Sequence, residues 1–366
     1  MRKRIIISVI NDLTTDQRVN KVAMSLAESG YDVLLVGRRL KSSFVIEDRP
    51  YKTKRLKLVF NKTVLFYTFY NLRLFLFFLV TKVDIFLAND LDTLPANFFA
   101  SKIRRKKLVF DSHELLSEVP ELVNKKTIKL IWQKLENYFI PRLENCYTVC
   151  QSIADWYLEK YNVHFEVVRN IPVSNPNIFI PKRPIELPED KIILYQGSLN
   201  LGRGLELAIK AMQHVDATLV IIGGGDIEEQ LKELTDKLRS KVFFLGKVPF
   251  QELDYYTKMA DVGISIEENL GLNYFYALPN KLFDYIHAEI PVLVSDFPEM
   301  KRIVDEYSIG KILKERNAKS LANILNNMLT DKEQIKNWKI NLKKAKEELT
   351  WENEKRVLLN VFKNAK

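Results

Sequence analysis

The sequence predicts an α/β protein built from two doubly wound parallel-sheet domains. The chain has 366 residues, which is more than one ordinary hydrophobic core accommodates. Short β-branched runs alternate with helical patterns in one half of the chain and again in the other, as in sheets with helices on both faces. The composition, with 47% apolar and 28% charged residues, excludes disordered and fibrous proteins.

The first half of the chain, residues 1–170, begins with a clear strand–helix–strand pattern. Val19, Val22, Ala23 and Leu26 follow the i, i+3, i+4, i+7 rule of a helix that packs on one face. This half is expected to form the first domain. Its predicted strands are Arg4–Ile10, Val33–Gly37, Asp84–Ala88, Leu108–Asp111, Cys146–Cys150 and Phe165–Arg169.

Residues 171–190 separate the two halves. They contain five of the thirteen prolines and show no helical period, so we interpret them as a linker. The alternation restarts over residues 191–349, the expected second domain. Because ligands of open α/β sheets bind beyond the carboxyl ends of the strands, both domains are expected to offer loops to a central cleft. The predicted strands are Ile192–Gly197, Thr218–Gly223, Val242–Gly246, Val262–Ile266 and Val292–Ser295.

Two features bear on the compartment. Cys146 and Cys150 would lie ~13 Å apart along a strand, too far for a disulfide, so we expect free thiols in a reducing compartment. The opening MRKRIIISVIND has the basic start of a signal peptide, but its apolar run is short, and we interpret it as a buried first strand. The sequence therefore predicts a cytoplasmic protein.

The segment 64–80 is rich in apolar and aromatic residues. Its 17 residues are interrupted by Thr68, Asn71 and Arg73, whereas a membrane-spanning helix needs roughly 20 residues with few charges, so it is not expected to span a membrane. Either it packs against the sheet or it contacts the anionic inner surface of a membrane. In the second case the residues expected to contact the membrane are Tyr67, Phe69, Phe75, Phe77 and Phe78.

The net charge of +10 is unevenly distributed. Residues 1–110 hold 21 Lys and Arg against 9 Asp and Glu. This excess indicates either an anionic partner, such as a phosphorylated substrate or an acidic membrane surface, or a solvated basic surface. No nucleic acid partner is expected, because charge is its only support and no aromatic-basic platform motif is present.

Two strand-to-helix turns of the second half combine small residues with a cation. In YQGSLNLGRGLELAIKAM, Gly197 ends a predicted strand and Arg203 precedes a predicted helix. In LVIIGGGD, Gly223 and Gly224 permit a close backbone approach or a positive φ. Such turns are candidates for holding a ligand.

The segment ALPNKLFDYIHAEI predicts a helix that begins at Pro279 and Asn280, with Lys281 in the first turn and Asp284 one turn later. A lysine there opposes the helix macrodipole unless an anion is present, and a diphosphate is the expected anion. Without a ligand, Lys281 and Arg203 are expected to repel each other. Asp284 shares the helix face of Lys281 and could accept a hydrogen bond from a ribose hydroxyl. The alternative is a surface Lys–Asp pair.

These motifs resemble glycosyltransferase family 4, retaining enzymes of the group 1 type with the GT-B fold. In the second half the matching pieces follow the family's order: YQGSLNLGRGLELAI, LVIIGGG, VFFLGKVPFQEL, ADVGISI and ALPNKLFDYIHAEIPVLVSD. In the first half NDLTTDQRVNKVAMSLAESGYDV, FLANDLDTLPANFFA and VFDSHE are similar to the family. The closing LTWENEKRVLLNVF resembles the helix, at about 350–366, that in this fold crosses back onto the first domain.

The resemblance implies roles for matching positions. Arg203 and Lys281 would bind the donor diphosphate and offset the charge on the leaving nucleotide, and Asp284 would bind the ribose. His113, in DSHE, matches a histidine that contacts the donor sugar near the reacting carbon, and backbone around Val248 would meet the base. The remaining expected site residues are Gly197, Gly223, Gly224, Asn280 and Asp16.

The chain departs from the family's pattern at three places. The first acid of the family's acidic pair falls at Tyr276, so sugar contacts are expected to differ or to come from Glu267 or Glu268. The glycine pair that the family has after the first strand is replaced by residues 11–16. The glycine usual before IPVL is Glu289, which predicts a strained helix end or a purely local change.

No metal site is expected. Asp90 and Asp92 form a D-x-D, which binds a divalent metal in GT-A transferases, but here we interpret them as a helix-capping or acceptor-side pair. His164, His214 and His287 show no metal-ligand spacing and are expected to be surface or packing residues.

The activity expected from the resemblance is transfer of a sugar from a nucleotide-sugar donor to an acceptor hydroxyl with retention. No cofactor is needed, because the two cations and the helix N-termini can stabilise the leaving diphosphate. The acceptor is expected to be a glycan or lipid-linked molecule of cell-envelope polysaccharide or glycolipid synthesis. The alternatives are a sugar-nucleotide epimerase or hydrolase of the same fold, and a non-catalytic transferase-like binding subunit.

Overall fold

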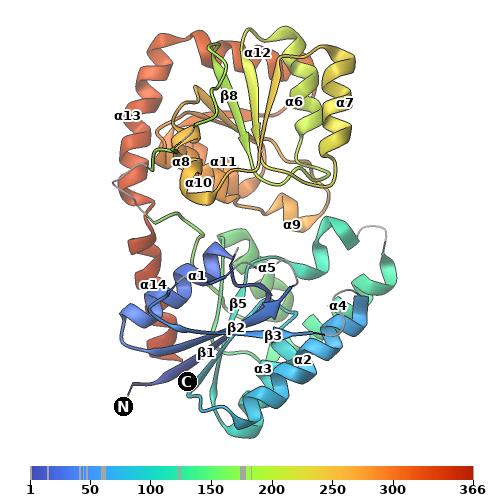
Figure 1. The fold of residues 1–366 in the computed structure, drawn as a ribbon, viewed down its shortest axis with the longest axis vertical. Helices are drawn as coiled ribbons and strands as arrows, with labels where there is room; N and C mark the ends of the chain where they lie inside the picture. The colour runs from blue at the N-terminus through green and yellow to red at the C-terminus, as the bar shows by residue number, and fades with distance from the viewer. Residues whose placement is uncertain are drawn as a thin grey trace. The chain divides into compact units, whose positions relative to one another are not determined.

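The computed structural model divides into two compact units, each with a parallel sheet and helices on both of its faces (Figure 1). Unit 1 comprises Met1–Asn170 with Glu354–Lys366, and unit 2 comprises Ile171–Asn353. The structure describes residues 2–14, 16–40, 43, 45–46, 48–58, 63–122, 125–173, 179–182 and 184–365. The predicted linker 171–190 therefore lies partly outside the described residues.

Unit 1 contains a seven-stranded sheet in the order β3-β2-β1-β4-β5-β6-β7. Every neighbouring pair in it is parallel, which confirms the predicted sheet class. The order reverses between β1 and β4, and loops at the carboxyl ends of these strands are the usual place for a ligand. The strands are β1 (Arg4–Asp12), β2 (Asp32–Arg39), β3 (Lys52–Lys57), β4 (Ile85–Asn89), β5 (Lys107–Ser112), β6 (Cys146–Thr148) and β7 (Glu166–Val167).

Two strands of this sheet differ from the sequence prediction. β3, with the sequence KTKRLK, was not predicted because its charged residues hide the alternating pattern; it lies at the sheet edge, where lysines oppose pairing with other chains. The strand predicted over Cys146–Cys150 ends at Thr148, and Cys150 precedes the next helix. Both cysteines are buried and free, as predicted.

The helix over the segment 64–80 packs on the sheet with one face. Phe66, Tyr70, Leu74 and Phe78 recur every four residues and are buried against strand residues such as Phe86. The prediction that Phe78 contacts a membrane is therefore wrong, because this side chain is buried in the core. The opposite face is exposed and apolar, with Leu65, Leu72, Leu76 and Val80. Among the described residues, no helix is both long and apolar enough to cross a bilayer.

The other helices of unit 1 flank the same sheet. Arg169 at the end of unit 1's first segment pairs with Glu354, whose carboxylate Oε1 accepts from the Arg169 Nε at 2.9 Å and whose Oε2 accepts from the backbone N–H at 2.7 Å. This pair fixes the last helix to the unit. The helices are α1 (Gln17–Glu28), α2 (Thr63–Val80), α3 (Leu94–Arg104), α4 (Lys126–Phe139), α5 (Gln151–Tyr161) and most of α14 (Trp351–Asn364).

Unit 2 contains a six-stranded parallel sheet in the order β10-β9-β8-β11-β12-β13. The short edge strand β13 was not predicted. The strands are β8 (Ile192–Gln196), β9 (Thr218–Ile222), β10 (Val242–Gly246), β11 (Val262–Ser265), β12 (Val292–Ser295) and β13 (Gly310–Leu313). The helices are α6 (Leu205–Ala211), α7 (Glu228–Leu238), α8 (Phe250–Thr257), α9 (Leu272–Phe275), α10 (Asn280–His287), α11 (Pro298–Tyr307), α12 (Ala318–Thr330) and α13 (Lys332–Glu348).

The predicted strained helix end is present after α10. Glu289 has φ of +61°, in the left-handed region where glycine is favoured. Its carboxylate accepts a hydrogen bond from Lys346 Nζ at 2.9 Å, a contact that glycine could not make.

Candidate functional site

Three charged side chains of unit 2 meet at the carboxyl ends of its strands. Glu267 follows β11, Arg203 lies in the turn between β8 and α6, and Lys281 lies in the first turn of α10. Lys281 Nζ donates to Glu267 Oε1 at 2.9 Å, and Arg203 Nη1 lies 3.9 Å from the same oxygen. The sequence prediction that Arg203 and Lys281 lie close together is consistent with this geometry.

The Glu267 carboxylate is ionised next to these two cations. Burial alone would raise the pKa of its carboxyl, but Lys281 and then Arg203 outweigh burial and lower it. The carboxylate is thus ionised and offsets one of the two positive charges. The expectation that Arg203 and Lys281 repel each other without a ligand is wrong, because an anion of the chain already lies between them.

The surroundings of the cluster restrict the two cations. Lys281 is buried, with Nζ 4.1 Å from the Tyr195 ring centroid. The Arg203 guanidinium carbon lies 4.6 Å from the Tyr274 ring centroid. Arg203 Nε is buried and donates to no described acceptor. A buried N–H without a partner is costly, so this donor is available to a ligand.

Two glycines allow the strand ends to approach each other next to Lys281. Gly197 has φ of +139° and Gly223 has φ of +144°, and a Cβ on Gly223 would lie 1.8 Å from the Gly197 carbonyl oxygen. A Cβ on Gly224 would lie 2.6 Å from Lys247 Cε. Glycine is therefore required at Gly223 for the close backbone approach that the sequence predicted.

The other expected donor residues of unit 2 are Asp284, Asn280 and Val248. Asp284 accepts a hydrogen bond from Gln196 Nε2 at 2.8 Å, which places its carboxylate beside the end of β8. Asn280 begins α10 and is exposed, Val248 follows β10 and is half-buried, and Tyr276 ends the short helix α9.

A second charged cluster lies in unit 1 around His113, just after β5. His113 Nε2 lies 2.8 Å from Asp111 Oδ2 and its Nδ1 lies 3.4 Å from Asp90 Oδ2. Arg18 Nη2 donates to Asp111 Oδ1 at 2.9 Å, and Arg18 Nη1 donates to the Val168 carbonyl at 2.9 Å. Arg18 and Asp111 are both buried, so they hold the imidazole in a fixed place.

The two carboxylates make the imidazole a cation. Burial lowers the pKa of His113, but Asp111 and Asp90 outweigh it and raise the pKa to about 9. His113 is therefore protonated at neutral pH and can only donate. Burial raises the pKa of Asp92 well above its ordinary value, with the neighbouring Asp90 charge adding to it, and Asp92 Oδ1 has no partner among the described atoms.

The helix-capping interpretation of the D-x-D is wrong. The cap of α3 is Thr93, without a side-chain cap bond, and Asp90 instead adopts a φ of +59° and accepts from the His113 backbone N–H at 2.7 Å. Asp16, in contrast, does cap a helix, because its carboxylate accepts a hydrogen bond from the Val19 N–H at the start of α1.

The remaining histidines are surface or packing residues, as predicted. His164 and His214 are exposed, and His287 lies 2.8 Å from the Leu349 carbonyl. Within the described part of the chain, no group of His, Cys, Asp and Glu is arranged to hold a metal ion.

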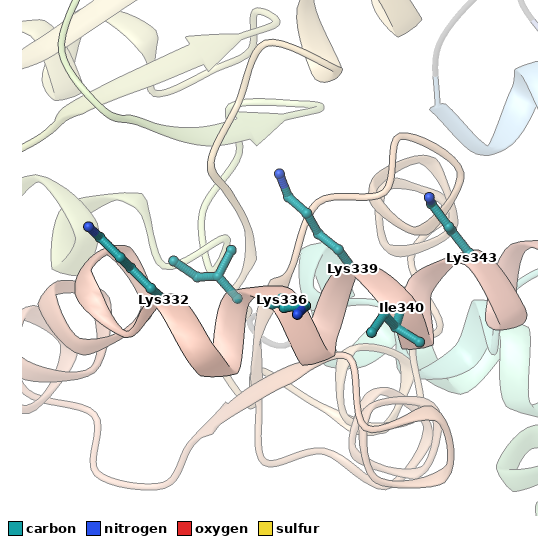
Figure 2. Close-up of a pocket in the computed structure, with 6 residues that line it drawn as sticks. Lys332, Lys336, Lys339, Ile340 and Lys343 are labelled. Carbon is teal, nitrogen blue, oxygen red and sulfur yellow. The ribbon is translucent and has the colours of Figure 1, made fainter.

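A shallow pocket of about 360 Å³ on α13 contains none of the predicted site residues. Figure 2 shows lysines lining it from one face of the helix. Its lining consists of Lys332, Ile335, Lys336, Lys339, Ile340 and Lys343.

Two family models match the chain. The model described as glycosyl transferases group 1 matches residues 178–345, and the model described as Glycosyltransferase Family 4 matches residues 17–172. The chain belongs to these GT-B glycosyltransferases. The two models together cover most of both units of the glycosyltransferase, in the order that the sequence motifs predicted.

Curated relatives match part of this glycosyltransferase. An uncharacterized glycosyltransferase of Methanocaldococcus jannaschii is 32% identical over 197 residues, covering 50% of this chain and 48% of the relative. The chitobiosyldiphosphodolichol beta-mannosyltransferase of Candida albicans is 22% identical over 259 residues, covering 62% and 56%. The chain thus spans about half the length of these two relatives.

Solved structures share the fold of the glycosyltransferase over its full length. Sucrose-phosphate synthase from Thermosynechococcus elongatus has a TM-score of 0.79 at 16% identity, covering 99% of this chain and 98% of that one. Anabaena HepE in complex with UDP-glucose has a TM-score of 0.72 at 13% identity, covering 98% and 99%.

Sequence reasoning missed the partners of the glycosyltransferase's charged residues. It named Glu267 only as a possible sugar contact, and it did not name Arg18 or Asp111 as site residues. The available signal was position: Glu267 and Asp111 both lie at the carboxyl end of a parallel strand, where a charge needs a partner.

Proposed function

We propose that the chain transfers a hexose from a nucleotide-sugar donor to an acceptor hydroxyl with retention at the anomeric carbon. The observation that carries the proposal is the cluster of Arg203, Glu267 and Lys281 beyond the strands of unit 2. Two cations held around one carboxylate, beside two backbone turns that only glycine permits, suit a diphosphate group.

The donor diphosphate would bind to Arg203 and Lys281. The free Arg203 Nε and the Lys281 ammonium supply charge-assisted donors, and the first turn of α10 adds backbone N–H groups. As the glycosidic bond breaks, negative charge grows on the leaving phosphate, and fixed cations stabilise it. The proposed reaction needs no metal and no cofactor, because these groups balance the charge.

Glu267 would act by holding the two cations in place. Its buried carboxylate accepts a hydrogen bond from Lys281 Nζ at 2.9 Å and so fixes the ammonium beside Gly197. Ser265 Oγ donates to Glu267 Oε2 at 2.9 Å and so orients the carboxylate. A prepositioned pair of cations costs little reorganisation when the transition state forms.

The transferred sugar would be bound by the unit 1 cluster. The 3.4 Å separation of His113 Nδ1 from Asp90 is longer than a good hydrogen bond, so a sugar hydroxyl could accept from Nδ1 in its place. Asp284 would bind the ribose, and the backbone around Val248 would contact the base. Asp16 would lie on the acceptor side of the site.

The substrates of similar proteins support the donor and acceptor classes. HepE was solved with UDP-glucose, and the Candida albicans relative is named for mannosyl transfer to chitobiosyldiphosphodolichol, a lipid-linked molecule. We infer a nucleotide-hexose donor and a glycan or lipid-linked acceptor of the cell envelope. A cytoplasmic location with peripheral contact at the inner face of the membrane is part of this proposal, supported by the exposed leucines of α2.

The proposal is tested by the fate of a labelled sugar. The chain is incubated with UDP-, GDP- and ADP-hexoses labelled in the sugar, with and without a lipid extract, and the products are separated. Label in a glycolipid or glycan with the anomeric configuration of the donor is expected. Label only in free sugar or in an isomerised donor would instead establish a hydrolase or epimerase, and binding of a donor without any product would establish a non-catalytic subunit.

A further inference from the structure

A cavity of about 630 Å³ opens at the amino-terminal edge of the unit 1 sheet. Arg4 starts β1, Asp32 starts β2 and Lys52 starts β3, and all three line it. In a parallel sheet this edge is opposite to the carboxyl ends that carry Asp90 and His113. The cavity is therefore separate from the candidate site.

The lining of the cavity is strongly basic. Five cationic side chains face one carboxylate, that of Asp32, and Asp32 is already engaged because its Oδ2 accepts from Arg4 Nε at 2.6 Å. Neither Arg2 nor Lys52 forms an ion pair with any residue in the described ranges. The cationic side chains are Arg2, Arg4, Arg49, Lys52 and Lys82.

Arg49 is held in place by a chain of hydrogen bonds. Its Nη1 donates to Tyr51 Oη at 2.9 Å, and Tyr51 Oη donates to Asn20 Oδ1 at 2.5 Å. Tyr51 is buried, which fixes its phenol ring. Tyr31 adds an aromatic wall, with its ring 6.4 Å from that of Phe362 on α14. The cavity is open to solvent, but its Arg49 guanidinium is held in a fixed position beside a buried tyrosine.

We propose that this cavity binds a phosphate-bearing anion. Its volume is within the range of about 300–1,000 Å³ that small-molecule sites occupy. Arginine presents parallel donors that match phosphate oxygens, and the excess of cations over carboxylates leaves charge for a ligand to balance. The phosphate could be that of a lipid headgroup or of a soluble phosphorylated molecule, and both share the chemistry that this cavity recognises.

A phosphate ligand in this cavity would account for the basic excess of residues 1–110, which the proposed donor site does not use. The excess of Lys and Arg in residues 1–110 is far from the Arg203 and Lys281 of unit 2 in the sequence and belongs to unit 1. The pocket on α13 is a suitable comparison, because it is also lined by lysines but has no arginine and no aromatic wall (Figure 2).

The test compares two pairs of substitutions that remove the same charge. Lys52→Ala with Lys82→Ala alters the cavity, and Lys339→Ala with Lys343→Ala alters the face of α13. Every protein also carries Arg203→Ala, so that pyrophosphate binding at the proposed donor site does not mask the result. Calorimetric titration with inorganic pyrophosphate measures affinity, and sedimentation with phosphatidylglycerol vesicles measures lipid binding.

The double variant Lys52→Ala with Lys82→Ala, the cavity pair, is expected to bind pyrophosphate roughly 10- to 30-fold more weakly than the parent. The double variant Lys339→Ala with Lys343→Ala, the α13 pair, is expected to show no comparable change. Weakened vesicle binding in the cavity pair as well assigns the phosphate to a lipid headgroup, and unchanged vesicle binding assigns it to a soluble molecule. Equal pyrophosphate affinity in the cavity pair and its parent, or equal losses in both pairs, would overturn the inference. No turnover is measured, so the result does not depend on the proposed transferase activity.

Discussion

Arg203 and Lys281 do not need a ligand to coexist, because the Glu267 carboxylate lies between them and offsets part of their charge. Their catalytic value therefore depends on what they do to a leaving diphosphate. Arg203→Ala and Lys281→Ala are each expected to lower turnover by about 10²–10³-fold, since each removes one donor that acts on charge in the transition state. Lys281→Arg should retain more of the rate than Lys281→Ala, because arginine keeps the positive charge but does not reproduce the position of the lysine ammonium. Steady-state turnover with the active donor measures this.

The two substitutions differ in their effect on folding, which provides the control. Lys281→Ala leaves the Glu267 carboxylate buried without its 2.9 Å partner and is expected to lower the free energy of unfolding by roughly 3–5 kcal/mol. Arg203 lies farther from Glu267, so Arg203→Ala should keep most of the stability. Lys343→Ala on α13 should change neither the turnover nor the free energy of unfolding. Normal turnover and normal nucleoside-diphosphate affinity in both variants would place the donor site elsewhere.

His113 is expected to act on the sugar and not on the nucleotide. His113→Ala should nearly abolish transfer while leaving nucleoside-diphosphate affinity almost unchanged, because the imidazole belongs to unit 1 and the diphosphate cluster to unit 2. Equilibrium dialysis with the nucleoside diphosphate and a transfer assay measure the two effects. Near-normal turnover of the variant would show that His113 is structural.

The charge of His113 also predicts a pH dependence of stability. Its pKa is raised to about 9 from an ordinary 6.5, so the stabilisation is complete below about pH 6.5 and is lost as the pH rises through 9. The loss should be at most about 3 kcal/mol. Urea unfolding at pH 6.5 and pH 9.5 measures it, and His113→Gln should show a smaller difference between the two pH values than the parent.

At the scale of elements, α2 illustrates how a helix rich in apolar residues divides its two faces. Leu74 is fully buried in the core, while Leu76, two residues later, is exposed. Leu74→Ala is expected to cost about 2–5 kcal/mol of unfolding free energy and Leu76→Ala less than about 0.5 kcal/mol. Chemical denaturation measures both. Equal effects of the two substitutions would mean that the helix packs differently.

Helices and strands could be predicted where their hydrophobic pattern in the sequence is clear. The buried strands and the helix after β1 follow from β-branched runs and helical spacing, and all the predicted strands have counterparts in the two sheets. The edge strand β3 could not be predicted, because four of its six residues are charged and hide the alternation of its burial. The face of α2 also could not be assigned, since apolar residues occur on both sides and only the sheet decides which side is buried.

Candidate site residues could be named from the sequence, but their ion pairs could not. The glycine and lysine candidates followed from turns and strand ends, and His113 followed from the family resemblance. The pairing of Glu267 with Lys281 joins residues 14 positions apart, and that of Arg18 with Asp111 joins residues 93 positions apart. Such pairs depend on the strand order of the sheet, which a local pattern does not contain.

At the scale of the whole molecule, the central proposal is that the chain binds a nucleotide sugar through Arg203 and Lys281. A thermal-shift panel of UDP-, GDP- and ADP-sugars with the parent, Arg203→Ala and Lys281→Ala tests this claim most directly, since a ligand of the native state raises stability by mass action. One nucleotide class at 100 times its Kd should stabilise the parent by roughly 2.7 kcal/mol and the two variants far less. An unchanged melting temperature of the parent with every donor, or an equal rise in all three proteins, would contradict the account.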